Sequence, residues 1–265
     1  VRYWGAGGVK LHTAVSKTYD AESALFDVHR LRHVIEPSVH ATYAWTNIEQ
    51  QNLPVFDYDV ESLAEGWTIR LGLRNTFQTQ RGGEGNWQSV DFIRIDTDLV
   101  FQDDDTIRES PTARFFNYRP EYSLAGDHLW TEVAWQTTDA LDVMANWTYS
   151  FDSDRTEAWN AGLTMDHNPT LSSFAQVRYL NRVDAMDTDS LLLRYGVEYL
   201  LSAKYHLAVA QTIDLERDDS RDISFVVTRR LPRMLLRVAF SYDTIENTTS
   251  VGLALTPEGL GGSGD

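Results

Sequence analysis

The chain has 265 residues, and its 39 acidic against 23 basic side chains give a formal charge of −16, which excludes a nucleic-acid-binding protein because phosphate contacts need a basic face. It contains no cysteine, so a disulfide framework, a thiolate metal site and a thiol nucleophile are excluded as well. No run of about 18 apolar residues is present, which excludes a transmembrane helix but not a membrane β-barrel, whose strands turn only alternate residues to lipid.

The first part of the chain predicts few regular elements. Glu36-Pro37 marks the expected start of a strand, since proline has no N–H to give to a β-ladder. The polar stretch 46–66 does not follow a single alternation, and neither does the acidic stretch 102–112. The strand boundaries in these two stretches are left open.

From about residue 65 onward, apolar and polar residues alternate in stretches of about ten, which predicts β-strands with two unlike faces. The first stretch is 67–78, in which Trp67, Ile69, Leu71, Leu73 and Phe77 form the apolar face. The pattern recurs at 141–151, 204–216 and 233–243. Turn residues separate the stretches, as at Gly82-Gly83, Ala125-Gly126-Asp127, Asp152-Ser153-Asp154, Asn168-Pro169 and Leu231-Pro232. We predict about 12–14 strands, joined in series as hairpins.

The opposite face of these strands carries many charges, and this favours a membrane barrel over a soluble one. A soluble meander of this length would normally divide into two packed sheets. In a membrane barrel the apolar face meets lipid, while charged residues on the other face line a water-filled lumen. Aromatic residues near strand ends, such as Trp67 and Trp147, suit the headgroup girdles, although aromatics also favour strands in general.

The expected fold class is therefore all-β, an antiparallel transmembrane β-barrel or part of a larger one, in the cell outer membrane. It covers residues 1–265, and 256–265 is expected to be a flexible tail. Near the end of the chain the connections alternate between short ones (around Asn168, Ser202 and Pro232) and longer ones (183–188, 216–221 and 244–248). This alternation is typical of barrels with short periplasmic turns and longer outer loops.

Three segments of the sequence match a pattern known from one protein family. Residues 31–39 read Leu-Arg-His-Val-Ile-Glu-Pro-Ser-Val and lead into His-Ala-Thr-Tyr-Ala-Trp at 40–45 and Gln-Asn-Leu-Pro-Val-Phe-Asp at 51–57. Weaker matches are the aromatic strand 147–152 and the segment 253–255 with Gly259 and Leu260. Together these segments resemble the carboxy-terminal barrel region of the LptD family of lipopolysaccharide-assembly proteins.

The resemblance implies an outer-membrane translocon that inserts lipopolysaccharide into the outer leaflet. It implies lipopolysaccharide and membrane lipid as ligands, a plug lipoprotein (LptE-like) and a periplasmic bridge protein (LptA-like) as partners, and no cofactor, metal or enzymatic activity. The family's periplasmic domain is missing here, so the chain is expected to be a fragment of a longer one. The family's late cysteine pair is also missing; the corresponding turn reads Leu231-Pro232-Arg233.

Two groups of residues are assigned candidate roles. The resemblance implies a lateral gate at the last strand, beside Val251, Leu253 and Leu255. Alternation places Arg70, Arg74, Arg194 and Arg237, together with Arg178, on the lumen side. These arginines could bind lipid phosphates through paired hydrogen bonds, but we favour an ion-pair ladder along the lumen wall.

Other functions are weighed against this one. A general or substrate-specific outer-membrane porin shares every compositional argument and is the main alternative. His29 and His33 would lie about 13 Å apart on a strand, too far to share a metal ion. Asp103-Asp104-Asp105 with Glu109 lacks the glycine and final glutamate of a calcium loop, so a solvated loop is favoured over divalent ions bridging lipopolysaccharide phosphates. His128, His167 and His206 are scattered singly, which argues against a catalytic cluster.

Overall fold

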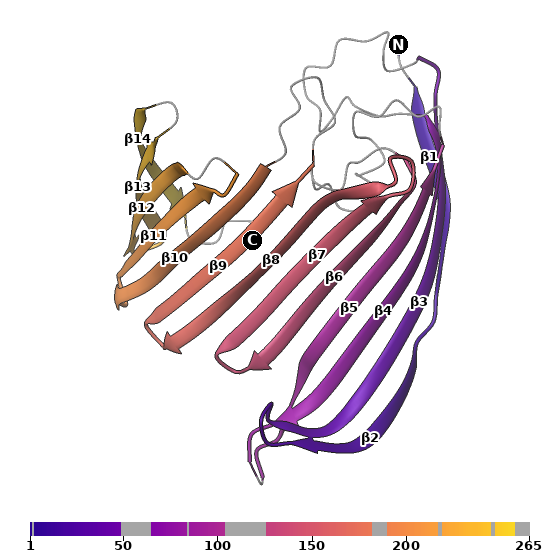
Figure 1. Ribbon diagram of the computed structural model, residues 1–265, viewed down its shortest axis with the longest axis horizontal. Coiled ribbons are helices and arrows are strands. Elements are labelled where there is room, and N and C mark those ends of the chain that lie inside the picture. The colour runs from indigo at the N-terminus through magenta and orange to yellow at the C-terminus, as the bar shows by residue number, and fades with distance from the viewer. Residues whose placement is uncertain are drawn as a thin grey trace. The chain divides into compact units, whose positions relative to one another are not determined.

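All regular structure in the described part of the chain is β-structure. The computed structural model describes residues 1, 3–48, 65–83, 85–103, 126–181, 190–216, 219–244 and 247–257 (Figure 1). Fourteen strands are present: β1 Trp4–His12, β2 Val15–Ser23, β3 Val28–Thr46, β4 Gly66–Arg81, β5 Gln88–Gln102, β6 His128–Thr138, β7 Leu141–Ser150, β8 Arg155–Asn168, β9 Leu171–Leu180, β10 Ser190–Ser202, β11 Tyr205–Asp214, β12 Asp219–Leu231, β13 Met234–Asp243 and β14 Thr248–Pro257. Nowhere do the described residues form a helix long and apolar enough to cross a membrane.

The predicted fold class is confirmed in its antiparallel, all-β construction and in its number of strands. The sheet has the order β1-β3-β4-β5-β6-β7-β8-β9-β10-β11-β12-β13-β14, with β2 paired to β3. The four alternating stretches of the sequence correspond to β4, β7, β11 and β13. Period two is a local property of the backbone, which explains why these strands could be located without knowing their neighbours.

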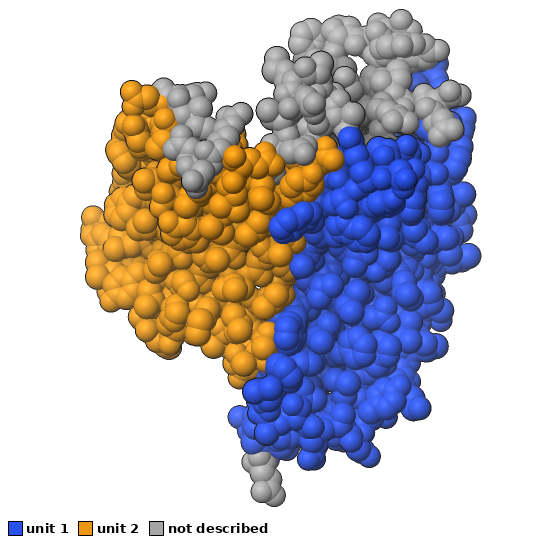
Figure 2. Space-filling view, in the orientation of Figure 1, with its two compact units in different colours: residues 1–136, 145–159 blue, residues 137–144, 160–265 orange. Residues whose placement is uncertain are grey.

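The chain divides into two compact units (Figure 2). Unit 1 comprises Val1–Gln136 and Ala145–Trp159, and unit 2 comprises Thr137–Met144 and Asn160–Asp265. Unit 1 contains β1 to β5 and most of β6, whereas unit 2 contains β9 to β14. Each unit is described by itself below.

In unit 1 the edge of the sheet is formed by β1 and β2, which pair one after the other with β3 and make up one edge row. β1 pairs with the second half of β3, from His12 opposite Ser38 onward, and β2 pairs with the first half, up to Val15 opposite Ile35. At the break, the Thr13 N–H donates to the Pro37 carbonyl at 3.2 Å. In an antiparallel ladder the N–H and C=O of one residue point to the same side, so the missing proline N–H falls on this row and interrupts it.

Pro37 therefore corrects one sequence prediction. Glu36-Pro37 was expected to start a strand, but both residues lie in the middle of β3, which runs from Val28 to Thr46. The strand continues because its other side is unaffected: Pro37 lies opposite Leu73 of β4, and the register of these two strands is regular from Arg32 opposite Gln78 to Ala44 opposite Gly66.

The connections alternate in length along the second half of the chain. Two-residue turns at 139–140, 169–170, 203–204 and 232–233 alternate with longer connections at 151–154, 181–189, 215–218 and 244–247. Arg233 has a φ of 66°, in the left-handed region that a two-residue hairpin turn requires. The alternation follows the sequence prediction.

Candidate functional site

The two faces of the sheet in unit 1 differ in chemistry, and the apolar one is the more exposed. On β3 and β4 the apolar face carries Val39 opposite Leu71 and Tyr43 opposite Trp67. These four side chains are 42%, 40%, 51% and 39% exposed. On the other face, Thr68 of β4 and Asp98 of β5 are buried. The face of Val39 and Leu71 is the apolar face of the sheet, and the face of Thr68 and Asp98 is its polar face.

This distribution is the reverse of that in a soluble protein. Among the described residues, twelve polar or charged side chains are buried against six hydrophobic ones. Polar groups are normally buried only when their hydrogen bonds are satisfied, and large apolar side chains are normally withdrawn from solvent. A sheet that exposes its apolar face is suited to a surrounding of lipid.

Unit 2 shows the same inversion. Tyr195, Val197 and Tyr199 of β10 are each about two-fifths exposed, with Val209 of β11 opposite Val197. The intervening Gly196 is buried opposite Ala210, on the polar face. The apolar face continues through β12 to β14 in the rows Phe225–Phe240–Val251 and Val227–Val238–Leu253.

The apolar face of unit 1 has the height of a membrane barrel's lipid-facing band. From Trp67 to Phe77, β4 extends by roughly 33 Å at the usual rise per residue. With a strand tilt of about 45°, this length corresponds to a band about 23 Å high, close to the ~25 Å typical of membrane barrels. Trp67 stands at one end of the band, and Phe77, stacked on His33 with ring centroids 4.1 Å apart, stands at the other.

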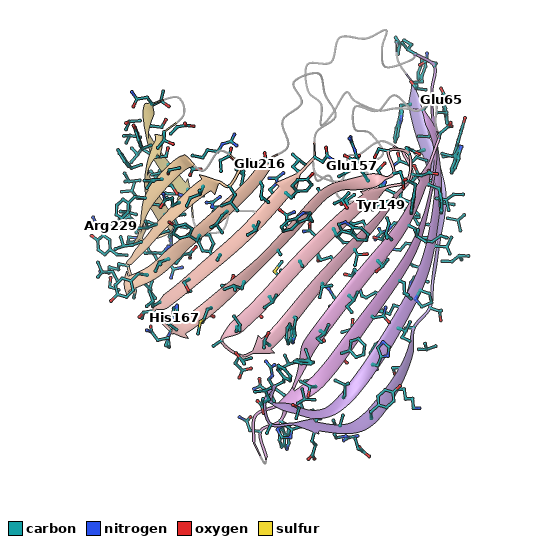
Figure 3. All side chains as sticks on the ribbon, viewed as in Figure 1. Glu65, Tyr149, Glu157, His167, Glu216 and Arg229 are labelled. Carbon is teal, nitrogen blue, oxygen red and sulfur yellow. The ribbon has the colours of Figure 1, made fainter. Side chains whose placement is uncertain are left out.

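The end of β7 carries aromatic side chains with polar partners, as expected near a headgroup layer. Trp147, Tyr149 and Phe151 follow one another on the apolar face, with ring centroids 5.8 and 5.7 Å apart. The Trp147 indole N–H donates to the Thr156 hydroxyl at 3.0 Å, and the hydroxyl of Tyr149, the residue labelled on this part of the sheet in Figure 3, donates to Asp154. Such side chains combine an apolar body with a polar tip, which suits the boundary between lipid and water.

The polar face of unit 1 holds a ladder of ion pairs across β4, β5 and β6. Arg70 pairs with Asp98, and Arg74 donates through Nε to Asp96 at 2.7 Å. Arg94 lies 3.2 Å from the second oxygen of Asp96 and 3.3 Å from Glu132. The carboxylates lie deeper than their partners: Asp98 and Asp96 are 9% and 13% exposed, against 34% and 54% for Arg70 and Arg74. The guanidinium groups therefore form the accessible layer of this face.

All five arginines assigned to the lumen side lie on the polar face of their unit, including Arg178, which lies opposite Leu192 in the row of Asp214. Arg70 and Arg74 belong to the ladder just described. Arg194 lies opposite Thr212, and Arg237 lies opposite Thr228 and Ala254; both arginine side chains are exposed. The carboxylates that complete the ladder were not singled out in the sequence, because their partners are set by the register between strands.

The residues assigned to a lateral gate lie on β14, whose ten residues are all exposed. Val251, Leu253 and Leu255 are on its apolar face, opposite Phe240, Val238 and Leu236 of β13. Their role as a gate stays a prediction. Residues 51–57, which are part of the resemblance to the LptD family, lie outside the described residues. The same holds for Asp104, Asp105, Glu109, Gly259 and Leu260.

The histidines of β3 are separated from one another. His29 contacts Asp27 at 3.1 Å, His33 contacts Asn75 at 3.0 Å, and His40 lies in register with Lys10 and Arg70. Within the described ranges, no group of three or more His, Cys, Asp or Glu side chains is placed to hold a metal ion.

Comparisons with known proteins find similarity at the level of structure. No family model and no curated protein matches the sequence. Similar solved structures include two porins: a variant of the Rh. blastica porin with five substitutions (TM-score 0.44, 9% identity) and a second variant with three (TM-score 0.42, 10% identity). Each comparison covers 96% of this chain and 99% of the porin. A structure described as "Asymmetric conductivity of engineered proteins" has a TM-score of 0.42 at 8% identity, with the same coverage.

These neighbours correct the predicted function. The sequence led us to expect a translocon that inserts lipopolysaccharide, but the similar structures are porins, the class that was its main alternative. The family segments are three to nine residues long and were too short to separate the two functions, because most of the chain between them shows only barrel alternation. The resemblance to the LptD family, and the LptE-like and LptA-like partners that it implies, stay untested predictions. Since every TM-score is below 0.5, the function proposed next rests on the residues of this chain alone.

Proposed function

We propose that the protein is a non-enzymatic pore of the outer membrane, through which small polar solutes diffuse. The observation that carries this proposal is the inversion of faces found separately in each unit. Apolar side chains are exposed on one face, and charged and polar side chains are gathered on the other. Lipid would solvate the first face, and water in the pore would solvate the second.

The polar face is too highly charged to serve as a protein core. Six ionised side chains of the ladder lie on β4, β5 and β6, and the arginines among them remain a third to a half exposed. Burying such groups in a dry interior would cost several kcal/mol per ion before any pairing. Water on this face removes most of that cost, and the ion pairs then hold the side chains against the wall.

Conductance tests the proposal directly. The chain, folded in detergent and added to a planar lipid bilayer, is expected to give stepwise currents that grow with salt concentration. The heat-denatured chain serves as the control. If the folded chain inserts into the bilayer and gives no current, the pore is ruled out.

Cysteine labelling tests the assignment of the faces, because the natural chain has no cysteine to interfere. Val238 and Ala239 are neighbours on β13 and lie on opposite faces. In the lipid-embedded protein, Ala239→Cys should react with a charged, membrane-impermeant thiol reagent and reduce the current. Val238→Cys should be protected by lipid. Equal labelling of the two positions would contradict a lipid-facing apolar surface.

A further inference from the structure

A row of basic side chains crosses three strands on the polar face of unit 1. The register places Lys10 of β1 opposite His40 of β3, and His40 opposite Arg70 of β4. Cross-strand partners point to the same face, so all three side chains share the face of the ion-pair ladder. Both Lys10 and Arg70 lie close enough to interact electrostatically with the His40 ring.

The two cations of the row, Lys10 and Arg70, lie on either side of His40. In the ladder nearby each arginine meets a carboxylate, as Arg74 meets Asp96. In the basic row, Asp98 pairs with Arg70, whereas Lys10 is exposed at the edge strand. The row thus places three nitrogen-bearing side chains side by side in a protein whose net charge is −16.

A glycine next to the row makes room for the Asp98 carboxylate. Gly72 follows Arg70 on the same face, and a Cβ there would lie 2.5 Å from the Ser38 hydroxyl and 2.8 Å from an Asp98 oxygen. The glycine lets the Asp98 carboxylate approach beneath Arg70. Because Asp98 is buried and the guanidinium lies above it, the arginine is held in place with its outer edge toward the solvent side.

We propose that Lys10, His40 and Arg70 form a binding site for a solute that carries a phosphate group. Lys10 and Arg70 lie two strands apart, about 10 Å between their backbones, and both side chains are long enough to reach one oxyanion above His40. A planar guanidinium and an ammonium group are the cations that phosphate prefers in proteins. Under the proposed function this face lines the pore, so the anion arrives through water and is not a headgroup of the surrounding bilayer.

The test measures binding of inorganic phosphate to the folded protein in detergent, by titration calorimetry, with chloride at equal ionic strength as the reference. Lys10→Gln is expected to weaken phosphate binding roughly tenfold, the effect of losing one charged hydrogen-bond donor. His40→Gln should also weaken it. The matched control is Lys17→Gln: Lys17 lies opposite His33 on the apolar face, over the Tyr19 ring at 5.1 Å, and its loss should leave phosphate binding unchanged.

The possible outcomes separate this site from the pore. Three results would overturn the site. The protein does not bind phosphate, chloride at equal ionic strength abolishes the binding, or Lys17→Gln weakens it as much as Lys10→Gln does. Phosphate binding that depends on Lys10 in a protein without conductance would support the site and reject the pore. Conductance that phosphate lowers in the natural chain, and lowers less in Lys10→Gln, would support both.

Discussion

Each of the two units has an exposed apolar face, but the polar faces of the two units differ. In unit 1 the polar face is a network of charges, in which Arg70, Arg74 and Arg94 meet carboxylates that are at most 14% exposed. In unit 2, from β10 to β14, charged residues such as Arg194, Glu198 and Arg237 are interspersed with small ones: Gly196, Ala208, Ala210, Ser224, Ala239, Ser241, Ser250, Gly252 and Ala254. Alternation thus sets which face is apolar, but it does not determine which polar or small residues form the opposite face.

The difference matters for what each wall can do. A network of paired charges fixes side chains in place and offers specific donors to a solute. The small residues of unit 2 occupy little space and leave gaps between its charged side chains.

The largest effect is expected where the two units agree. Val238→Arg puts a charge on the apolar face and should lower the free energy of unfolding from lipid by about 2–4 kcal/mol. Ala239→Arg, one residue further on the polar face, should change it by less than about 1 kcal/mol, because the new side chain reaches water. Urea titration in lipid vesicles measures both. If Ala239→Arg proved the more costly, the faces would be assigned the wrong way round.

The next effect concerns the charged wall. Asp98→Ala removes the buried partner of Arg70 and should cost about 2 kcal/mol, less than a fully buried pair because Arg70 still reaches water. The comparison in unit 2 is Arg237→Ala, an exposed side chain whose loss should change stability by less than about 0.5 kcal/mol. The same urea titration applies. Equal costs would mean that the ladder contributes no more than isolated surface charges.

Two glycines test how tightly the wall of unit 2 is packed. A Cβ on Gly196 would lie 2.5 Å from the Val209 carbonyl and 2.8 Å from the Phe174 ring, so Gly196→Ala should destabilise the protein by about 1–3 kcal/mol. A Cβ on Gly252 meets only the Ala239 Cβ, at 3.8 Å, so Gly252→Ala should be within about 0.5 kcal/mol of neutral. Thermal melting of the two variants compares them. Similar melting temperatures would show that the Phe174 ring moves aside.

The smallest effect is the coupling within single pairs. A double-mutant cycle on Arg74→Gln and Asp96→Asn should give a coupling of about 0.5–1 kcal/mol, since Arg74 is partly exposed. The exposed pair His206 and Glu198 of unit 2, 3.2 Å apart, should couple by less than about 0.5 kcal/mol at neutral pH. A larger value in unit 2 would remove the contrast between the two walls.

The sequence predicted the local part of this structure. The apolar face of β4 and the faces of β7, β11 and β13 follow from alternation, which each strand shows without reference to its neighbours. The placement of Arg70, Arg74, Arg194 and Arg237 on the polar face follows for the same reason.

Features that depend on register could not be predicted in this way. Asp98 meets Arg70 only because β4 and β5 pair with one irregularity, between Phe77 and Gln78, and no local signal fixes that shift. The Lys10–His40–Arg70 row likewise joins residues 30 positions apart along the chain. The role of Pro37 was misread because its consequence falls on a neighbouring strand.

The interruption of the edge row at Pro37 affects local unfolding in unit 1. Because Pro37 has no N–H to give to this row, the pairing there is reduced to the bond from the Thr13 N–H to the Pro37 carbonyl, and β1 and β2 are held to β3 by two separate sets of hydrogen bonds. Local opening of such a segment requires only its own hydrogen bonds to break. We therefore expect the amide protons of β1 and of β2 to exchange with solvent at different rates, each set by its own half of the row.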